Sequence, residues 1–377
     1  MRRPSETAIG TWSGGRFLHF GETIDADRLV GLLRPNGIDT LLSADAYGQG
    51  EGDRLLGRAL SGVERDEYCL IGAVGHDYYE GKRDGPRGFP RFTDPALRDE
   101  RGYADYLTMA TERSLERIGV DRFDVLLMHN PDRTGYRSEQ VWAAMARLRD
   151  EGLTGQCGIA PGPANGFTLD LIGCFERYGE LVDWAMIILN PLEPWPGELC
   201  MAAAADNGVE LITRVADYGG LFWDDLDADT PLEKGDHRAF RPDGWVADGL
   251  ASLAKMRPIA DRYDLTPMQL ACKWNLAHEP VRCVVPTLIQ ETGAGRRTIE
   301  EKRAELAALP AETTLDAEAV EAIRQIGDNR GCMALKGASP DHTEAERPDR
   351  WRLDSASEAV AGRWGIDPAL DLHGKRA

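Results

Sequence analysis

The chain has 377 residues, of which 42% are hydrophobic and 28% charged, a composition typical of a globular protein with a full core. Its formal net charge of −19 argues against nucleic acid or an anionic membrane surface as a partner. No apolar stretch is long enough to cross a bilayer, and residues 1–7 lack the apolar segment of a secretory signal. We therefore expect a cytoplasmic protein. Nothing in the sequence indicates its oligomeric state.

The cysteines are odd in number and scattered, and none has the spacing of a zinc site. Several lie within apolar runs, so we expect buried free thiols rather than disulfides. The seven are Cys69, Cys157, Cys174, Cys200, Cys272, Cys283 and Cys332. A run of acids, Asp224, Asp225, Asp227 and Asp229, lacks the spacing of a hard-ion loop and is predicted to face solvent.

Eight short, continuous apolar blocks alternate with amphipathic stretches along the chain. Blocks of this kind are typical of strands that are buried on both faces. The predicted strands are residues 7–12, 38–42, 68–74, 123–128, 156–160, 184–189, 209–215 and 281–285. Helical periodicity appears between them at residues 138–149, which Gly152 follows as a stop signal, and at 266–278, where Pro267 occupies an early helical position.

Eight strands interleaved with helices indicate either a closed (β/α)8 TIM barrel or a large doubly wound sheet. The doubly wound alternative predicts a Gly-x-Gly-x-x-Gly turn, but the best match, residues 48–52, has the wrong spacing and carries Glu51, with Asp53 directly after it. We therefore predict a barrel, in which residues at the carboxyl ends of the strands face the active site. Two long loops, 75–101 and 216–246, are predicted to leave that face.

The last segment lies outside the barrel pattern. We divide the chain into a barrel at residues 1–327 and an extension at 328–377, and the extension is predicted to pack on the barrel through Trp351 and Trp364.

Three segments resemble motifs of the aldo/keto reductase superfamily, and the resemblance covers roughly residues 7–327. The first strand carries Gly10-Thr11-Trp12. The second strand and its turn read GIDTLLSADAYG at 37–48, and the fourth-strand region reads RSLERIG at 113–119 followed by DVLLMHNPD at 124–132. The resemblance implies a barrel that reduces carbonyls by hydride transfer from a nicotinamide dinucleotide, usually NADPH, bound without a Rossmann fold.

The resemblance also implies a catalytic tetrad of Asp, Tyr, Lys and His. Tyr47 and His129 occupy the tyrosine and histidine positions, whereas the aspartate and lysine positions read Leu42 and Ala73. Removing one partner of a buried ion pair costs about 3–5 kcal/mol, but replacing both with apolar groups can be neutral. Without a neighbouring ammonium, we expect Tyr47 to have a pKa of about 10 or higher, which makes it a weak acid and a weaker base.

The family positions that hold the nicotinamide carboxamide have lost their polar side chains and read Ala160, Pro161 and Met186. The cofactor, NADP or NAD, therefore needs rebuilt contacts. Candidates are Asn165 in the loop after the fifth strand, Asn190 after the sixth, Arg214 on the seventh, and Arg296 and Arg297 at a helix start that suits a phosphate. A solvated helix start explains the last two equally well.

Five further residues are candidates for substrate binding, each with a structural alternative. They are Asp45 (or a turn residue), His76 (or an exposed loop histidine), Trp195 as an apolar wall between two prolines, and Asp217 with Tyr218 beyond Arg214.

Three functional hypotheses remain open from the sequence. The first is a nicotinamide-dependent oxidoreductase that acts on a sugar-like or other polar carbonyl or alcohol, with Tyr47 and His129 as acid/base groups. The second is a non-redox lyase, dehydratase or isomerase in which Arg214 holds an oxyanion or carboxylate. The third is a catalytically silent binding protein. Because both Tyr47 and His129 are retained, the sequence favours an enzyme over a silent protein. We expect no metal ion.

Overall fold

The computed structural model describes residues 1–13, 16–17, 20–84, 88–162, 168–227, 229–330, 346 and 351–372. All eight predicted strands are present, and their ends differ from the predicted ones by no more than two residues. They are β1 (Ala8–Gly10), β2 (Thr40–Leu42), β3 (Cys69–Val74), β4 (Phe123–His129), β5 (Thr154–Ala160), β6 (Val182–Ile188), β7 (Glu210–Arg214) and β8 (Val281–Val285).

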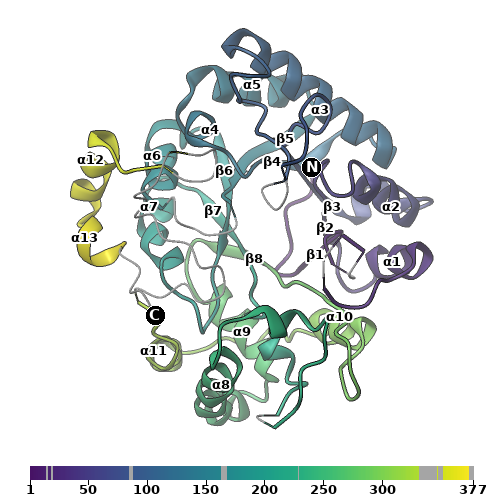
Figure 1. Ribbon diagram of the computed structural model, residues 1–377, viewed down its shortest axis with the longest axis vertical. Coiled ribbons are helices and arrows are strands. Elements are labelled where there is room, and N and C mark those ends of the chain that lie inside the picture. The colour runs from purple at the N-terminus through teal and green to yellow at the C-terminus, as the bar shows by residue number, and fades with distance from the viewer. Residues whose placement is uncertain are drawn as a thin grey trace.

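The strands form one parallel sheet in chain order, β1 to β8. The sheet closes on itself where Thr7 bridges Val284, and the Val284 amide donates to the Glu6 carbonyl at 2.9 Å. Helices surround the strands (Figure 1). The fold is therefore the predicted (β/α)8 barrel and not a doubly wound sheet.

Helices alternate with the strands in the order that the barrel requires. They are α1 (Ala26–Leu33), α2 (Glu51–Leu60), α3 (Tyr103–Ile118), α4 (Arg133–Arg137), α5 (Glu139–Asp150), α6 (Thr168–Tyr178), α7 (Met201–Asp206), α8 (Trp245–Arg262), α9 (Pro267–Leu276), α10 (Ile299–Ala307), α11 (Ala317–Ile326), α12 (Ser355–Trp364) and α13 (Pro368–Asp371). Both periodic segments became helices, α5 and α9. A capping box of Thr266 and Gln269 begins α9, with Pro267 in its first turn.

The barrel interior is a separate apolar cluster that runs from strand to strand. It includes Leu42, Ala73, Ala160 and Met186, all of them buried. A larger apolar cluster lies between the strands and the helices. The six cysteines in the described residues are buried free thiols, as predicted, and Cys332 lies outside the described residues. Among the described helices, none combines the length and the apolarity that a bilayer crossing requires.

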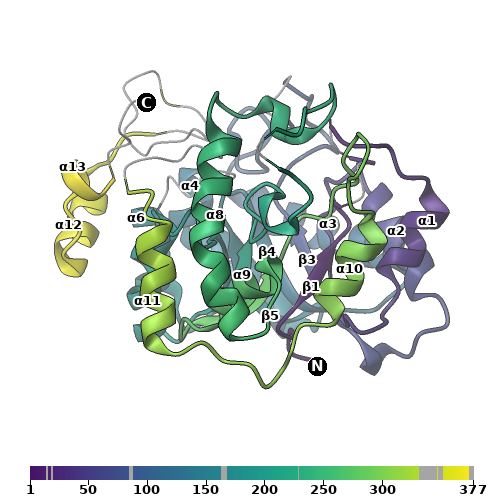
Figure 2. The ribbon, with the colours of Figure 1, turned by 90° about the horizontal axis from the view of Figure 1, so that it is seen from below.

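The C-terminal helices α12 and α13 lie outside the barrel wall beside α6 (Figures 1 and 2). Trp351 donates its indole N–H to Asp170 of α6 at 2.9 Å, and Trp364 donates to Glu176 at 2.9 Å. Asp354 accepts from Arg137 at 2.6 Å, and this neighbour holds the pKa of the Asp354 carboxyl well below its usual range. Both tryptophans therefore attach this segment to the same helix.

Candidate active site

Three polar side chains meet at the carboxyl ends of the strands. His129 is the last residue of β4, Arg214 is the last residue of β7, and Tyr47 lies in the turn that follows β2. The Tyr47 and His129 rings meet edge to face, with their centroids 5.7 Å apart. In (β/α)8 enzymes the catalytic groups lie at this end of the barrel, which we call the barrel mouth.

Tyr47 is a neutral phenol whose hydroxyl is available to a ligand. Its ring packs against the apolar interior cluster and lies 4.8 Å from the Trp12 ring, measured between centroids. Burial raises the pKa of Tyr47 to about 12, and the positive charge of Arg214 lowers it only in part. Within the described residues the hydroxyl makes no hydrogen bond, yet it is not sealed from solvent. Tyr47 can therefore donate a hydrogen bond to a substrate oxygen at neutral pH.

His129 is also neutral, because its surroundings disfavour a positive charge. Burial moves its pKa well below the usual value, and His76, Arg91 and Arg214 lower it further. Its Nδ1 atom is buried without a partner, while Nε2 makes no hydrogen bond in the described part of the chain and is not sealed. His129 therefore offers one ring nitrogen to the barrel mouth.

His76 lies beside His129, and its exposed fraction is 9%. The sequence predicted either a substrate contact or an exposed loop histidine at this position. The two rings are 5.0 Å apart. Its Nδ1 lies 3.1 Å from the Phe89 carbonyl, and its Nε2 lies 2.9 Å from the Asn130 amide nitrogen. Nδ1 also lies 3.2 Å from an Arg91 terminal nitrogen, which can only donate, so Nδ1 faces one acceptor and one donor. Burial, followed by the charge of Arg91, lowers the pKa of His76 to about 3. Its ring packs edge to face against the His129 ring.

Apolar side chains surround the Tyr47 ring at the two positions where the resemblance implied an aspartate and a lysine. Leu42 and Ala73 are buried in the interior cluster, and no acid or ammonium acts on the Tyr47 pKa in their place. The phenol therefore keeps the high pKa that the sequence predicted.

Arg214 is the charged group of the site. One terminal nitrogen donates to the Gly162 carbonyl at 2.7 Å and to the Pro161 carbonyl at 3.2 Å. Burial lowers its pKa, and Tyr47, Tyr136 and Glu193 raise it in part. Arg214 forms no ion pair with any described carboxylate, and its Nε and second terminal nitrogen make no hydrogen bond in the described ranges.

Asp45, predicted as a substrate contact or a turn residue, is sealed from solvent. It is completely buried, and neither carboxylate oxygen has a hydrogen-bond partner among the described residues. Burial raises its pKa well above the usual value, and the carboxyl acts on the pKa values of Tyr78 and Tyr79 in the 75–101 loop rather than on Tyr47. Its side chain is therefore turned beneath that loop.

Three further candidates are engaged by the protein itself. Trp195 is buried and donates its indole N–H to the Asp371 carbonyl at 2.5 Å, which ties it to the extension. Asn190 is fully buried, with its amide donating to the Val215 carbonyl at 3.2 Å. Tyr218 stacks on Trp245, with ring centroids 4.9 Å apart. These contacts give all three a structural role.

Asp217 is buried near the start of the 216–246 loop, which follows β7. One oxygen accepts from the Thr287 amide at 3.0 Å, and the other has no partner in the described part of the chain. Burial raises its pKa. Asn165, another predicted cofactor contact, lies outside the described residues.

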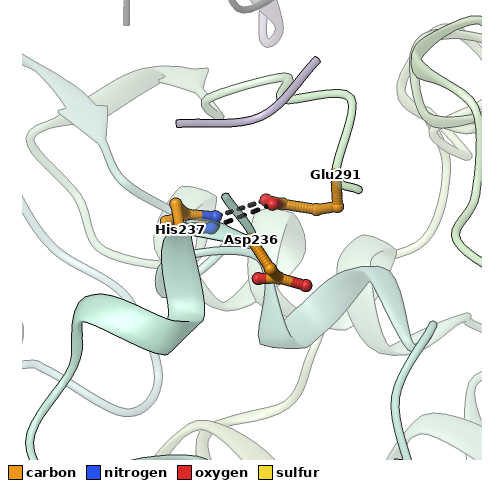
Figure 3. A group of neighbouring side chains, drawn as sticks. All are labelled: Asp236, His237 and Glu291. Carbon is orange, nitrogen blue, oxygen red and sulfur yellow. Dashed lines mark hydrogen bonds and ion pairs between the residues drawn. The ribbon is translucent and has the colours of Figure 1, made fainter. Parts of the chain in front are cut away.

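The loops after β7 and β8 are joined by a buried charged cluster that the sequence did not predict. Asp225, expected to face solvent, is buried and pairs with Arg238 at 2.6 Å, while Lys302 lies 3.7 Å away. Figure 3 shows His237 facing the Glu291 carboxylate, with Asp236 beside them. The partners lie as far apart in sequence as residues 225 and 302, so no local spacing reveals them.

Those three groups, Asp236, His237 and Glu291, lie within 4.8 Å of one another, close enough to share a metal ion. However, the Asp236 carboxylate already accepts two hydrogen bonds from Arg238, both of 2.8 Å, and lies 3.4 Å from Arg296. Lysine and arginine therefore balance the acids, and the cluster is best described as an ion-pair network.

Arg296 and Arg297 are bound by the protein's own acceptors. Arg296 donates to the Asp225 carbonyl at 2.9 Å, and Arg297 donates to the Trp223 carbonyl at 3.1 Å. Thr298 and Glu301 form a capping box on α10, and the Ile299 amide donates to the Gln290 side chain at 3.1 Å. The amides of Thr298, Ile299 and Glu301, which could otherwise donate to a phosphate, already donate to side-chain oxygens of the protein.

A nicotinamide dinucleotide, the cofactor that the resemblance implies, does not fit these residues in the expected way. The carboxamide positions Ala160, Pro161 and Met186 carry no polar side-chain atom. The loops that often form a phosphate site in such barrels, those after β7 and β8, hold their own buried carboxylates. A bound dinucleotide would need contacts other than those that the resemblance implies.

Comparisons with known proteins agree with the geometry. The sequence pattern of the aldo/keto reductase family matches residues 8–328. A D-threo-aldose 1-dehydrogenase of Pseudomonas sp is 26% identical over 295 residues, 74% of this chain and 82% of that protein. A probable voltage-gated potassium channel subunit beta of Arabidopsis thaliana is 22% identical, covering 84% of this chain and 93% of that protein.

Solved structures show the same fold. The glycerol dehydrogenase AKR11B4 from Gluconobacter oxydans superposes with a TM-score of 0.66 at 18% identity, covering 92% of this chain and 97% of that one. The holo form of aldo-keto reductase AKR11C1 from Bacillus halodurans gives 0.60 at 20% identity, covering 86% and 96%. On the strength of the family match over most of its length, this chain belongs to the aldo/keto reductase family, a family of oxidoreductases.

Proposed function

We propose that this protein is an oxidoreductase acting on a polar, sugar-like carbonyl or alcohol, with Tyr47 and His129 as its acid/base groups. The proposal is carried by one observation: the Tyr47 and His129 rings contact each other at the mouth of an aldo/keto reductase barrel. Within the described residues, the Tyr47 hydroxyl and the His129 Nε2 make no hydrogen bond, and neither atom is among the buried ones. Two similar proteins, a D-threo-aldose 1-dehydrogenase and a glycerol dehydrogenase, are named for polyhydroxylated substrates.

The protonation states favour donation of a proton over its removal. With a pKa of about 12, Tyr47 is protonated at neutral pH and donates to the oxygen on which negative charge develops. His129 is neutral, so its Nε2 can position the same oxygen or a neighbouring hydroxyl without adding charge. The nearby guanidinium of Arg214 stabilises the developing oxyanion. Reduction of a carbonyl should therefore be faster than oxidation of the alcohol near neutral pH.

NADP or NAD is the hydride source in this proposal, and its binding needs contacts that differ from the family pattern. The apolar carboxamide positions and the satisfied start of α10 favour a second candidate in which no dinucleotide is used. In that candidate the same three groups catalyse a dehydration or isomerisation: neutral His129 takes the proton from the carbon, Tyr47 protonates the leaving or migrating oxygen, and Arg214 holds the oxyanion.

Calorimetric titration of the full chain with NADPH, NADP, NADH and NAD separates the two candidates. Binding at micromolar strength, about −8 kcal/mol, supports the oxidoreductase and should be followed by a screen of sugars and small carbonyls. If none of the four binds, the oxidoreductase proposal is refuted. The same substrates should then be tested for elimination and isomerisation, with Tyr47→Phe as the inactive control.

A further inference from the structure

We propose that Asp45 is a pH-sensitive latch of the 75–101 loop: the loop closes over the protonated acid and opens, with release of that proton, as the pH rises. The proposal goes beyond the proposed function, because the loop opens or closes whatever reaction the barrel mouth catalyses. It assigns a role to a completely buried acid that the acid/base groups of the site do not use.

The first support is that the closed loop leaves Asp45 without any hydrogen bond that stabilises a carboxylate. Its side chain is completely buried, and neither oxygen has a hydrogen-bond partner among the described residues. An ionised carboxylate that is removed from water without hydrogen bonds is far less stable than a neutral carboxyl group in the same place. The closed arrangement therefore suits the protonated acid.

The second support is that the positive charge beside Asp45 is already paired with another acid. Arg117 is that charge: its Nε donates to Asp53 at 3.1 Å, and one terminal nitrogen lies 3.0 Å from the same carboxylate oxygen. Asp53 also accepts from the hydroxyls of Ser43, at 2.7 Å, and Ser114, at 2.8 Å. Since one arginine balances one acid, the second neighbouring carboxyl group keeps its proton.

The third acid in this region, Asp77 of the loop itself, is satisfied in the same way. It accepts from the amides of Tyr79, at 3.0 Å, and Glu80, at 2.9 Å, and it forms an ion pair with Arg98. Of these three acids, Asp45 is the one that lacks a partner within the described part of the chain. The proton is therefore assigned to Asp45.

The groups that face Asp45 from the surrounding elements agree with this assignment. They are Asp53 on α2, Arg117 and Tyr106 on α3, and Asp77, Tyr78 and Tyr79 in the loop. Burial raises the pKa of Asp45 well above its usual value, and the two other acids raise it further. Arg117 and the Ala46 amide lower this pKa only in part.

The loop that covers Asp45 also reaches the barrel mouth. Tyr78 and Tyr79 stack on each other in this loop, with their ring centroids 4.1 Å apart. At the start of the loop, the His76 ring lies 5.0 Å from the His129 ring. Opening of the loop therefore gives Asp45 access to water and changes the surroundings of His129.

The test is hydrogen–deuterium exchange of the full chain, measured by mass spectrometry between pH 6.5 and 8 and corrected for the intrinsic effect of pH on exchange. Two amides report the opening: Asp77 donates to the Pro90 carbonyl at 2.8 Å, and Phe92 donates to the Gly75 carbonyl at 3.0 Å. An opening that releases one proton becomes about tenfold more favourable per pH unit. We expect the protection of loop peptides to fall accordingly, while peptides from β4 and β5 keep theirs.

Two variants remove the ionisable group and keep the branched shape of the side chain. Asp45→Asn and Asp45→Leu should both protect the loop more strongly than the wild-type chain does at pH 8, and their protection should not change with pH. Glu80→Gln is the matched control, because it removes an exposed acid of the same loop that pairs with Arg98. This control should keep the pH dependence of the wild-type chain.

Three results would overturn the proposal. The first is loop protection in the wild-type chain that does not change with pH, or that changes equally in Asp45→Asn. The second is weaker loop protection in both Asp45 variants at every pH, which would mean that an ionised Asp45 stabilises the closed loop through a bound water or cation. The third is an equal fall in β4 and β5, which would place the pH dependence in the whole barrel.

Discussion

Asp225→Asn should strongly destabilise the protein, because it removes one charge from a fully buried pair. Asp225 accepts from Arg238 at 2.6 Å, both side chains are completely buried, and the Lys302 ammonium lies 3.7 Å away. Breaking a buried pair from one side typically costs about 3–5 kcal/mol, and the lower end applies here because Arg238 keeps its ion pair with Asp236. Asparagine keeps the shape and part of the hydrogen bonding, so we expect about 3 kcal/mol.

The assay is urea denaturation followed by fluorescence and circular dichroism, with the midpoint and slope compared between variants. Asp224→Asn is the matched control: the neighbouring acid is half-exposed, pairs with Arg257 at the surface, and should cost less than about 1 kcal/mol. Adding Lys302→Met to Asp225→Asn should cost less than the sum of the two single changes, because the excess positive charge is then removed. If Asp225→Asn costs no more than Asp224→Asn, the loops after β7 and β8 are not held together by this network.

Three further predictions follow from the contacts described above. Tyr47→Phe should lower turnover by about 10²–10⁴-fold without lowering the melting temperature, because the hydroxyl has no partner in the described residues; retained turnover would exclude Tyr47 as the proton donor. Folded His76 titrates at about 3 and an unfolded histidine at about 6.5, so the unfolded state binds the extra proton and stability falls as the pH drops between these values. At pH 4.5 this should cost about 2 kcal/mol relative to pH 7, and His76→Asn should show a flatter pH profile of the denaturation midpoint; an unchanged profile would contradict the neutral buried ring. Trp351→Phe should weaken docking of α12 by about 1–2 kcal/mol, because the buried Asp170 loses a donor at 2.9 Å; limited proteolysis should then cut the extension sooner, and equal resistance would contradict this role.

The strands could be predicted from the sequence because they depend on local signals. A strand buried on both faces is written as a short apolar block, and eight such blocks interleaved with helices leave few topologies. The family resemblance singled out Tyr47 and His129, and the fold places both at the carboxyl ends of the strands, while their catalytic role remains a prediction. The sequence also shows directly that Leu42 and Ala73 stand where the resemblance implies an aspartate and a lysine.

The tertiary structure decided which polar groups remain available to a ligand. Asp45 follows β2 just as Tyr47 does, yet the turn directs it beneath the 75–101 loop, where it is sealed. The sequence predicted that Asp225 faces solvent with the other acids of its run. In the structure Arg238 and Lys302 place positive charge beside its buried carboxylate. Pairings across 70 or more residues depend on how long loops pack, and loop packing has no periodic signal in the sequence. For this reason the sequence determined the barrel, whereas only the fold distinguished Arg214, which forms no ion pair within the described residues, from Arg296 and Arg297, which the chain itself binds.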